Sequence, residues 1–118
     1  MTNTPLGSNT ALAEILAALA ETIDARADEG DASSSYTAKL LSKGPPKTAK
    51  KLGEEAVELA IALTSEGDDE VAGETADLIF HLFVALRSRG ITLDQIAETL
   101  KARQGLSGLA EKASRQPD

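Results

Sequence analysis

Two acidic pairs stand out in the middle of this sequence. The segment GEEAVE carries Glu55 and Glu58, preceded by Glu54, and the segment GETAD carries Glu74 and Asp77. Residues three or four apart in a helix lie one above another on a single face. Like charges at this spacing destabilise a helix, and burying unpaired carboxylates beside apolar residues costs still more free energy. A divalent cation offsets both costs, so the two pairs predict a metal site.

The available ligand types narrow the choice of metal. The chain has no cysteine and a single histidine, His81, which excludes Cys-ligated and multi-histidine sites. Carboxylates alone suit a hard cation such as Mg²⁺ or Mn²⁺. A pair of ions could clamp both sides of a phosphoryl displacement. The alternative is that these glutamates form a solvated helix surface, because Glu is a good helix former.

A lysine-rich stretch precedes the acidic pairs. Five of the twelve basic residues lie in it: Lys39, Lys43, Lys47, Lys50 and Lys51. Lysines and the free amides of a helix N-terminus bind phosphate. A phosphate-binding helix end beside a cation-binding helix middle is what a nucleotide polyphosphate requires. The alternative is that individual lysines pair with Glu54 or Glu55 on the same helix.

Tyr36 and His81 complete the candidate substrate-binding residues. Tyr36 stands before the lysine-rich stretch, where it could contact a base or ribose or simply anchor a short helix. His81 follows Asp77 by one helical turn and could bond a carboxylate or a substrate group. Phe80 and Phe83 stand beside it and favour a histidine in the core or at an interface.

The periodic spacing of apolar residues, together with residues that typically begin and end helices, predicts an all-α fold. Apolar residues at spacings of three and four, with Gly, Pro, Ser and Asp between the segments, place the helices at about 10–27, 36–42, 46–65, 68–88 and 93–103. The apolar positions of the first segment predict one buried stripe: Leu12, Ile15, Leu16, Leu19 and Ile23. The expected organisation is a leader over 1–9, one domain over 10–104 and a partly ordered tail over 105–118.

The length and net charge of the chain limit the classes of partner that we expect. With 118 residues and a net charge of −7, the chain is a single small domain with an acidic surface, which disfavours nucleic-acid binding. No apolar run approaches the roughly 20 residues of a membrane span. Residues 1–9 lack the features of a signal peptide, so we expect a cytoplasmic protein. A core this small favours an oligomer.

Three segments closely resemble one known enzyme family. SYTAKLLSKGP, AKKLGEEAVELA and GETADLIFHLFVAL are similar to the phosphoribosyl-ATP pyrophosphatases (diphosphatases) of histidine biosynthesis, within the MazG-like all-α nucleoside triphosphate pyrophosphatases. The shared pattern is EExxE followed by ExxD, here Glu54-Glu55-x-x-Glu58 and Glu74-x-x-Asp77. The resemblance spans roughly residues 34–103. Thr48 departs from it, because an apolar residue is expected there.

The resemblance implies both a reaction and an architecture. The reaction is magnesium-dependent hydrolysis of the α–β phosphoanhydride of phosphoribosyl-ATP, giving phosphoribosyl-AMP and pyrophosphate. The architecture is a MazG-like bundle of four to five helices completed by dimerisation, so a homodimer is expected.

The resemblance also implies roles for individual residues. The metal ligands would be Glu55, Glu58, Glu74 and Asp77. Glu54 would be a further ligand or the base that orients water, and either Glu54 or Glu55 could accept the proton of that water. On grounds of charge, the outgoing pyrophosphate or the ribose phosphate would be held by Lys43, Lys47 and Lys51.

Two other functions fit the same residues. One is a pyrophosphatase of the same superfamily that clears deoxynucleoside triphosphates, with the same metal site and another substrate pocket. The other is a non-catalytic helical binding protein whose carboxylates face solvent.

Overall fold

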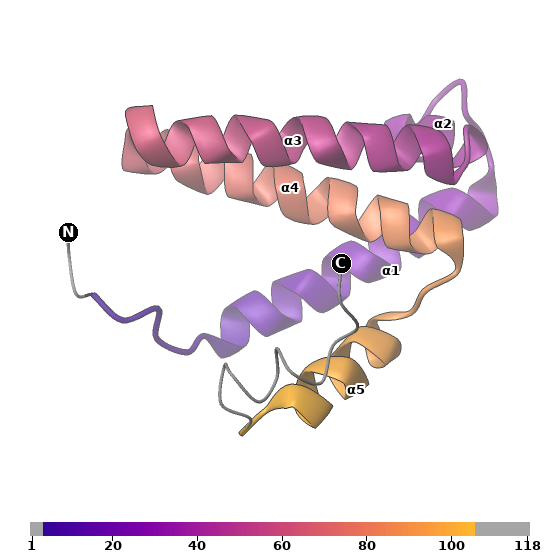
Figure 1. The fold of residues 1–118 in the computed structure, drawn as a ribbon. Helices are drawn as coiled ribbons and strands as arrows, with labels where there is room; N and C mark the ends of the chain where they lie inside the picture. Colours follow the sequence, from indigo (N-terminus) through magenta and orange to yellow (C-terminus); the bar gives the residue numbers. More distant parts are fainter. Residues whose placement is uncertain (1–3, 106–118) are drawn as a thin grey trace, which may run out of the picture.

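In a computed structural model of the chain, residues 4–105 form five α-helices and no strand (Figure 1). The helices are α1 (Thr10–Glu29), α2 (Tyr36–Ser42), α3 (Pro45–Ser65), α4 (Asp68–Arg89) and α5 (Leu93–Arg103). The all-α prediction is therefore confirmed. The predicted leader over 1–9 and tail over 105–118 lie partly outside the described residues, at 1–3 and 106–118.

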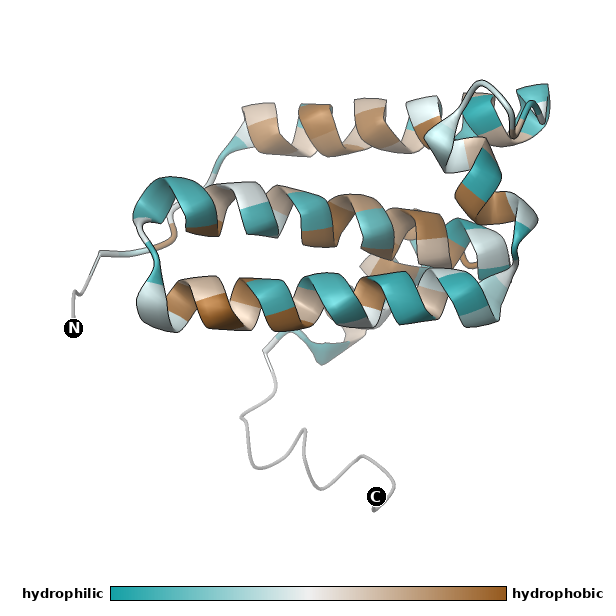
Figure 2. Cartoon of the chain, turned by 90° about the horizontal axis from the view of Figure 1, so that it is seen from above, coloured by the Kyte–Doolittle hydropathy of each residue, from teal (hydrophilic) through white to brown (hydrophobic). Residues whose placement is uncertain are grey.

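The α3–α4 pair is the frame of the molecule. A tight turn at Glu66 and Gly67 joins the two helices, which run antiparallel along most of their length (Figure 1). The three long helices lie side by side when seen from above, and α4 packs against both α1 and α3 (Figure 2). Short α2 contacts each of these three helices at the end of the bundle where α3 begins. The segment with the acidic pairs is therefore the most rigidly paired part of the fold.

Local capping explains where several helices begin. Asn9, rather than Thr10, caps α1, because its Oδ1 accepts a hydrogen bond from the Leu12 amide at 2.8 Å. The Ser35 hydroxyl accepts a hydrogen bond from the Ala38 amide at 3.1 Å and caps the start of α2. Thr92 and Gln95 form a reciprocal capping box at the start of α5.

The ends of α3 and α4 depend on glycine and proline. Gly44 adopts a φ of 79° at the N-cap of α3, so the chain turns sharply and Pro45 becomes the first helical residue, one earlier than predicted. Gly67 stands at the N-cap of α4 without a side-chain hydrogen bond, and Asp68 is the first residue of the helix. Gly90 closes α4 in the left-handed conformation.

The core is small and lies between α1, α2 and α4. Ile23, Leu40 and Val84 are its buried centre, and the partly buried residues packed around it are Leu19, Leu41, Phe80 and Phe83. The predicted buried stripe of α1 is wrong in its first half, because Leu12 and Ile15 are 50% and 63% exposed. Helix α1 crosses α4 at an angle, and its N-terminal half diverges from the bundle (Figure 1).

Further large apolar side chains stay exposed on α3 and α5. They include Val57, Ile61 and Leu63 on α3 and Leu100 on α5, each more than half exposed. Within residues 4–105, no helix combines the length and the apolar character needed to cross a membrane.

A partly buried pair of hydroxyls, Thr48 with Ser88, ties α3 to α4 and explains why a threonine occupies position 48. Thr48 is only 1% exposed, and its Oγ1 lies 2.7 Å from the Ser88 Oγ. The carbonyl oxygens of Pro45 and Ala85 lie within hydrogen-bond distance of the two hydroxyls, at 3.2 and 2.8 Å. Whichever hydroxyl donates across the helices, the other can donate to a carbonyl of its own helix.

Replacing Thr48 with Val should lower the free energy of unfolding by about 1 kcal/mol, because one buried hydrogen bond is lost and the shape is kept. Urea denaturation at one fixed protein concentration measures the change. Thr64→Val is the matched control: Thr64 is exposed on the same helix and bonds only to carbonyls of its own turn. The control should stay within about 0.5 kcal/mol of the parent, and an unchanged Thr48→Val protein would contradict the tie.

Candidate functional site

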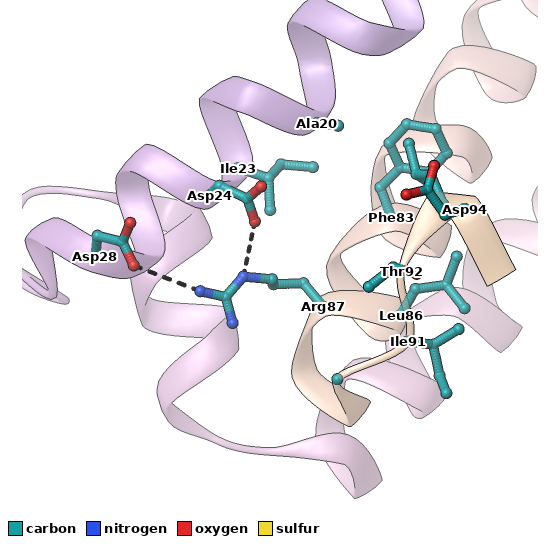
Figure 3. A pocket seen from close by; sticks show the side chains of 12 residues that line it. Ala20, Ile23, Asp24, Asp28, Phe83, Leu86, Arg87, Ile91, Thr92 and Asp94 are labelled. Carbon is teal, nitrogen blue, oxygen red and sulfur yellow. Dashed lines mark hydrogen bonds and ion pairs between the residues drawn. The ribbon is translucent and has the colours of Figure 1, made fainter.

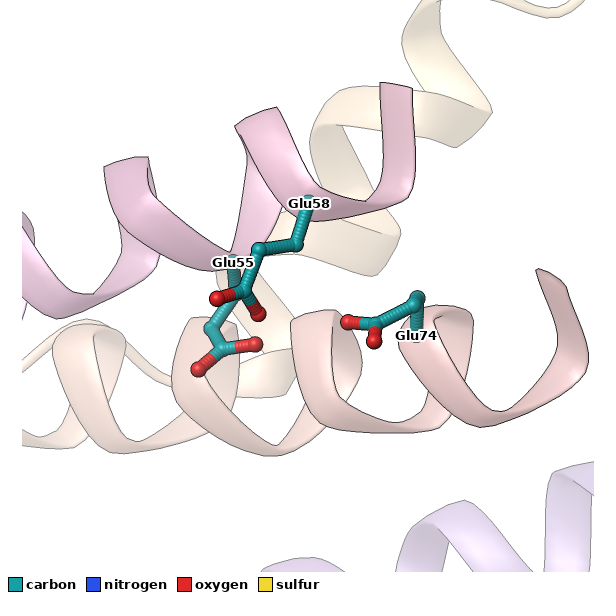
Figure 4. Close-up of side chains that lie close together, drawn as sticks. All are labelled: Glu55, Glu58 and Glu74. Carbon is teal, nitrogen blue, oxygen red and sulfur yellow. The ribbon is translucent and has the colours of Figure 1, made fainter. Parts of the chain in front are cut away.

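Three carboxylates converge between α3 and α4. Glu55 and Glu58 extend from α3 and Glu74 extends from α4, and the three side chains point toward one another (Figure 4). One carboxylate oxygen from each lies within 4.8 Å of the others. The spacing of three on α3 stacks the first two, and the antiparallel neighbour brings the third to the same height. We call these three residues the acidic cluster.

The acidic cluster is electrostatically unfavourable without a counter-charge. Burial is the main cause that raises the pKa of Glu55, and the adjoining Glu58 carboxyl adds to it. Burial also leads the causes that raise the pKa of Glu74, followed by the charges of Glu58 and Asp77. Glu55 is only 9% exposed. The site therefore favours either protons or a bound cation.

The oxygen atoms of the acidic cluster test whether a cation fits. Among residues 4–105, Glu55 Oε2 and Glu74 Oε2 are buried and have no hydrogen-bond partner within the protein. Buried carboxylate oxygens without donors are rare, because each loses its hydration. A divalent cation ligated by oxygen would satisfy both, and the all-carboxylate donor set matches Mg²⁺ or Mn²⁺. These residues therefore fit the predicted metal.

Asp77 and Glu54 lie at the margin of the acidic cluster. Asp77 is exposed one turn after Glu74 on α4 and does not join the three carboxylates at the same short distances. Its charge still contributes, after burial, to the raised pKa values of Glu55 and Glu74. Glu54 is more exposed than Glu55, and its Oε2 lies 3.5 Å from Lys51 Nζ.

The predicted phosphate-binding lysines lie in the first two turns of α3 and just before that helix. Lys47 and Lys51 are four apart and share a face of α3, and Lys43 precedes the glycine that starts this helix. The charge of Glu54 and then that of Tyr36 raise the pKa of Lys51. Lys51 therefore lies near Glu54 and Tyr36 and stays a cation at neutral pH.

Tyr36 and His81 meet each other, which their 45-residue separation hides in the sequence. The Tyr36 hydroxyl lies 3.3 Å from His81 Nε2, while His81 Nδ1 lies 2.9 Å from the Asp77 carbonyl oxygen. The same Nδ1 lies 4.0 Å from Glu55 Oε1. His81 is thus buried beside the acidic cluster, and Tyr36 is exposed above it.

A larger hollow lies elsewhere on the molecule. It measures about 620 Å³ between α1, the end of α4 and the start of α5, with Phe83, Leu86 and Ile91 among its walls (Figure 3). Arg87 spans it and pairs with Asp24 at 2.8 Å and with Asp28 at 3.5 Å. None of the acidic cluster lines this hollow, and its ion pairs join Arg87 of α4 to two carboxylates of α1.

Comparison with known proteins confirms the family resemblance. The model of the family described as phosphoribosyl-ATP pyrophosphohydrolase matches residues 16–104. A phosphoribosyl-ATP pyrophosphatase of Caulobacter vibrioides is 54% identical over 104 residues, which cover 88% of this chain and 95% of that protein. One of Erythrobacter litoralis is 55% identical over 97 residues, covering 82% and 92%. Phosphoribosyl-ATP pyrophosphatase 1 of Rhodopseudomonas palustris is 52% identical over 100 residues, covering 85% and 92%.

The raised pKa values predict how stability depends on pH. A carboxyl whose pKa is raised on folding stabilises the fold below its ordinary value of 4.5, and this contribution disappears as pH rises through the raised value. The metal-free melting temperature should therefore fall between about pH 4.5 and neutrality through Glu55 and Glu74. Saturating Mn²⁺ at pH 7.5 should raise it on the order of 10 °C, and at pH 5 by much less, because protons compete.

Glu58→Gln separates charge repulsion from metal binding. It should melt a few degrees higher than the parent without metal at pH 7.5, because one repelling charge is gone, and should lose most of the Mn²⁺ shift. Glu21→Gln, an exposed change of equal charge on α1, should alter neither value. Equal Mn²⁺ shifts in the parent and Glu58→Gln, measured by differential scanning fluorimetry, would remove the acidic cluster as the site.

Proposed function

The chain belongs to the phosphoribosyl-ATP pyrophosphohydrolase family, and we propose that it catalyses the reaction for which that family is named. Water cleaves the α–β phosphoanhydride of phosphoribosyl-ATP, and the products are phosphoribosyl-AMP and pyrophosphate, an early step of histidine biosynthesis. The observation that supports this most strongly is that the three carboxylates of the acidic cluster lie close together and that two of their oxygens are buried without hydrogen-bond donors.

The proposed cofactor is Mg²⁺, with Mn²⁺ as a substitute. Glu55, Glu58 and Glu74 would hold it, and Asp77 would join as the fourth ligand through a rotation of its exposed side chain. When bound, the cation neutralises phosphate oxygens and lowers the pKa of a coordinated water. The role of the four side chains is to keep negative charge fixed at one place before the substrate arrives.

Glu54 is the proposed general base. It adjoins Glu55 on α3 but stays exposed, so its carboxylate can reach a water and return the proton to solvent. Glu55 is the alternative base suggested by its raised pKa, chiefly through burial. A carboxylate that ligates a cation loses that basicity, which favours Glu54.

The proposed phosphate contacts are Lys43, Lys47 and Lys51. Lys51 Nζ lies 3.5 Å from Glu54 Oε2 at the margin of the acidic cluster, and the charge of Glu54, with that of Glu55 as a lesser cause, raises the pKa of Lys51. A polyphosphate that displaces Glu54 from this pair would gain a cation beside the scissile bond. Tyr36, exposed next to Lys51, can offer its ring to the ribose or base.

Activity measurements test this assignment. The parent chain with Mg²⁺ should convert phosphoribosyl-ATP to phosphoribosyl-AMP and pyrophosphate. Anion-exchange chromatography separates and quantifies the substrate and the products. Glu58→Gln and Asp77→Asn should each lower kcat/KM by at least ~100-fold through loss of a cation ligand. Glu21→Gln should remain active.

A panel of deoxynucleoside triphosphates separates this proposal from the clearing of nucleotide pools. Their hydrolysis at a higher kcat/KM than that of phosphoribosyl-ATP would favour the other branch of the superfamily. Failure to hydrolyse either substrate class would favour a non-catalytic binding protein.

The exposed apolar residues support a homodimer as the working form. Leu12 and Ile15 on α1 are each at least half exposed, and so are Val57 and Ile61 on α3. Within each pair the spacing of three or four residues places both side chains on one face of the helix, so each helix exposes an apolar face. Pairing with a second copy would remove these faces from water and enlarge a core that is small within one chain.

Sedimentation equilibrium should therefore give a mass twice the 12.3 kDa of the chain. Ile61→Asp should shift the molecules toward the single-chain mass, because a charge would enter the apolar contact. Lys50→Asp, an exposed charge change on the same helix, is the control and should stay paired. A single-chain mass for the parent at micromolar concentration would contradict the dimer.

A further inference from the structure

We propose that His81, steadied by the Tyr36 hydroxyl, is a positioning residue that orients the Glu55 carboxylate toward the cation. This inference rests on the proposed function, since it assigns to Glu55 the role of a metal ligand. Of the alternatives that the sequence left open for His81, this role is the contact with a carboxylate rather than with the substrate.

The hydrogen bonds of His81 define where its proton lies. Nδ1 lies 2.9 Å from the carbonyl oxygen of Asp77, which can only accept, so Nδ1 carries the hydrogen. Nε2 of the neutral ring is then an acceptor, and the Tyr36 hydroxyl at 3.3 Å donates to it. Both ring nitrogens are thus engaged by the protein, and His81 is only 7% exposed.

The two oxygens of Glu55 face different surroundings. Oε1 lies 4.0 Å from His81 Nδ1, too long for a hydrogen bond, so this oxygen adjoins the N–H side of the ring, whose hydrogen is donated to the Asp77 carbonyl oxygen. Oε2 is the buried oxygen without a partner. Because Oε1 lies beside the ring, Oε2 is the oxygen left without a partner and available to the cation.

Aromatic contacts hold the imidazole in this orientation. The Phe80 ring stands edge-on to His81, with centroids 5.0 Å apart and planes at 88°. Tyr36 stands edge-on at 6.2 Å and is nearly parallel to Phe80, at 17°. Tyr36 is the first residue of α2, so its hydroxyl connects this short helix to His81.

The same arrangement links two predicted ligands. His81 bonds the backbone of Asp77 and faces the side chain of Glu55, so one ring lies between α4 and α3 beside the residues that would hold the cation. Partners of this kind, which hold metal ligands without touching the metal, typically change metal affinity by about 10–100-fold when mutated.

Two amide substitutions of His81 test the donor directly. The amide nitrogen of Asn occupies the place of Nδ1, whereas that of Gln reaches only the place of Nε2. His81→Gln should bind Mn²⁺ about 10–100-fold more weakly, and His81→Asn should stay within about 5-fold of the parent. Tyr36→Phe should weaken binding several-fold, because the ring remains and the hydroxyl is lost. Electron paramagnetic resonance of free Mn²⁺, without nucleotide, measures the affinities, and circular dichroism confirms folding.

The controls separate this inference from the metal site itself. Loss of Mn²⁺ binding in Glu74→Gln, together with unchanged binding in His81→Gln, would overturn the positioning role and leave the site standing. Equal weakening in His81→Gln and His81→Asn would also overturn it, because the Nδ1 donor would then be irrelevant. A parent chain that binds no Mn²⁺ would overturn both proposals. Weakening in His81→Gln with recovery in His81→Asn supports the positioning role.

Discussion

The repulsion among three converging carboxylates is the constraint on which the rest of this structure depends. Glu55, Glu58 and Glu74 bring oxygens within 4.8 Å of one another, and one oxygen each of Glu55 and Glu74 is buried without a donor. Left to themselves, such side chains would rotate into water, and the two helices would gain stability by letting them do so. Their convergence therefore indicates a site shaped for a charge that the chain itself does not carry.

Contacts elsewhere in the fold keep α3 and α4 together despite the repulsion between their carboxylates. The α3–α4 pair is tied at its far end by Thr48 and Ser88 and is closed at the other end by a tight turn. Short α2 adds Tyr36 on one side, and α1 covers α4 with the core around Ile23 and Val84. Few apolar side chains are fully buried in this arrangement, which is why a second copy is a natural source of further stability.

Periodic and local features were predictable from the sequence, and contacts between distant segments were not. Helix bounds agree within two residues, because caps and glycines such as Gly90 act locally. The carboxylate spacing predicted the shared face of α3 and its meeting with Glu74. No periodicity encodes the bond between Tyr36 and His81, or the exposure of Leu12 and Ile15, which follows from the crossing angle of α1. Asp77 is an intermediate case, because its register was predicted but its exposed rotamer was not.

Anomalous diffraction from crystals grown with Mn²⁺ tests the central claim most directly. The account predicts a peak bounded by carboxylate oxygens of Glu55, Glu58 and Glu74, with an oxygen of Asp77 turned inward to meet it. The Glu55 oxygen nearest the peak should be the one that faces away from His81. A map with no peak between α3 and α4, or with manganese bound only at exposed surface acids, would contradict the account.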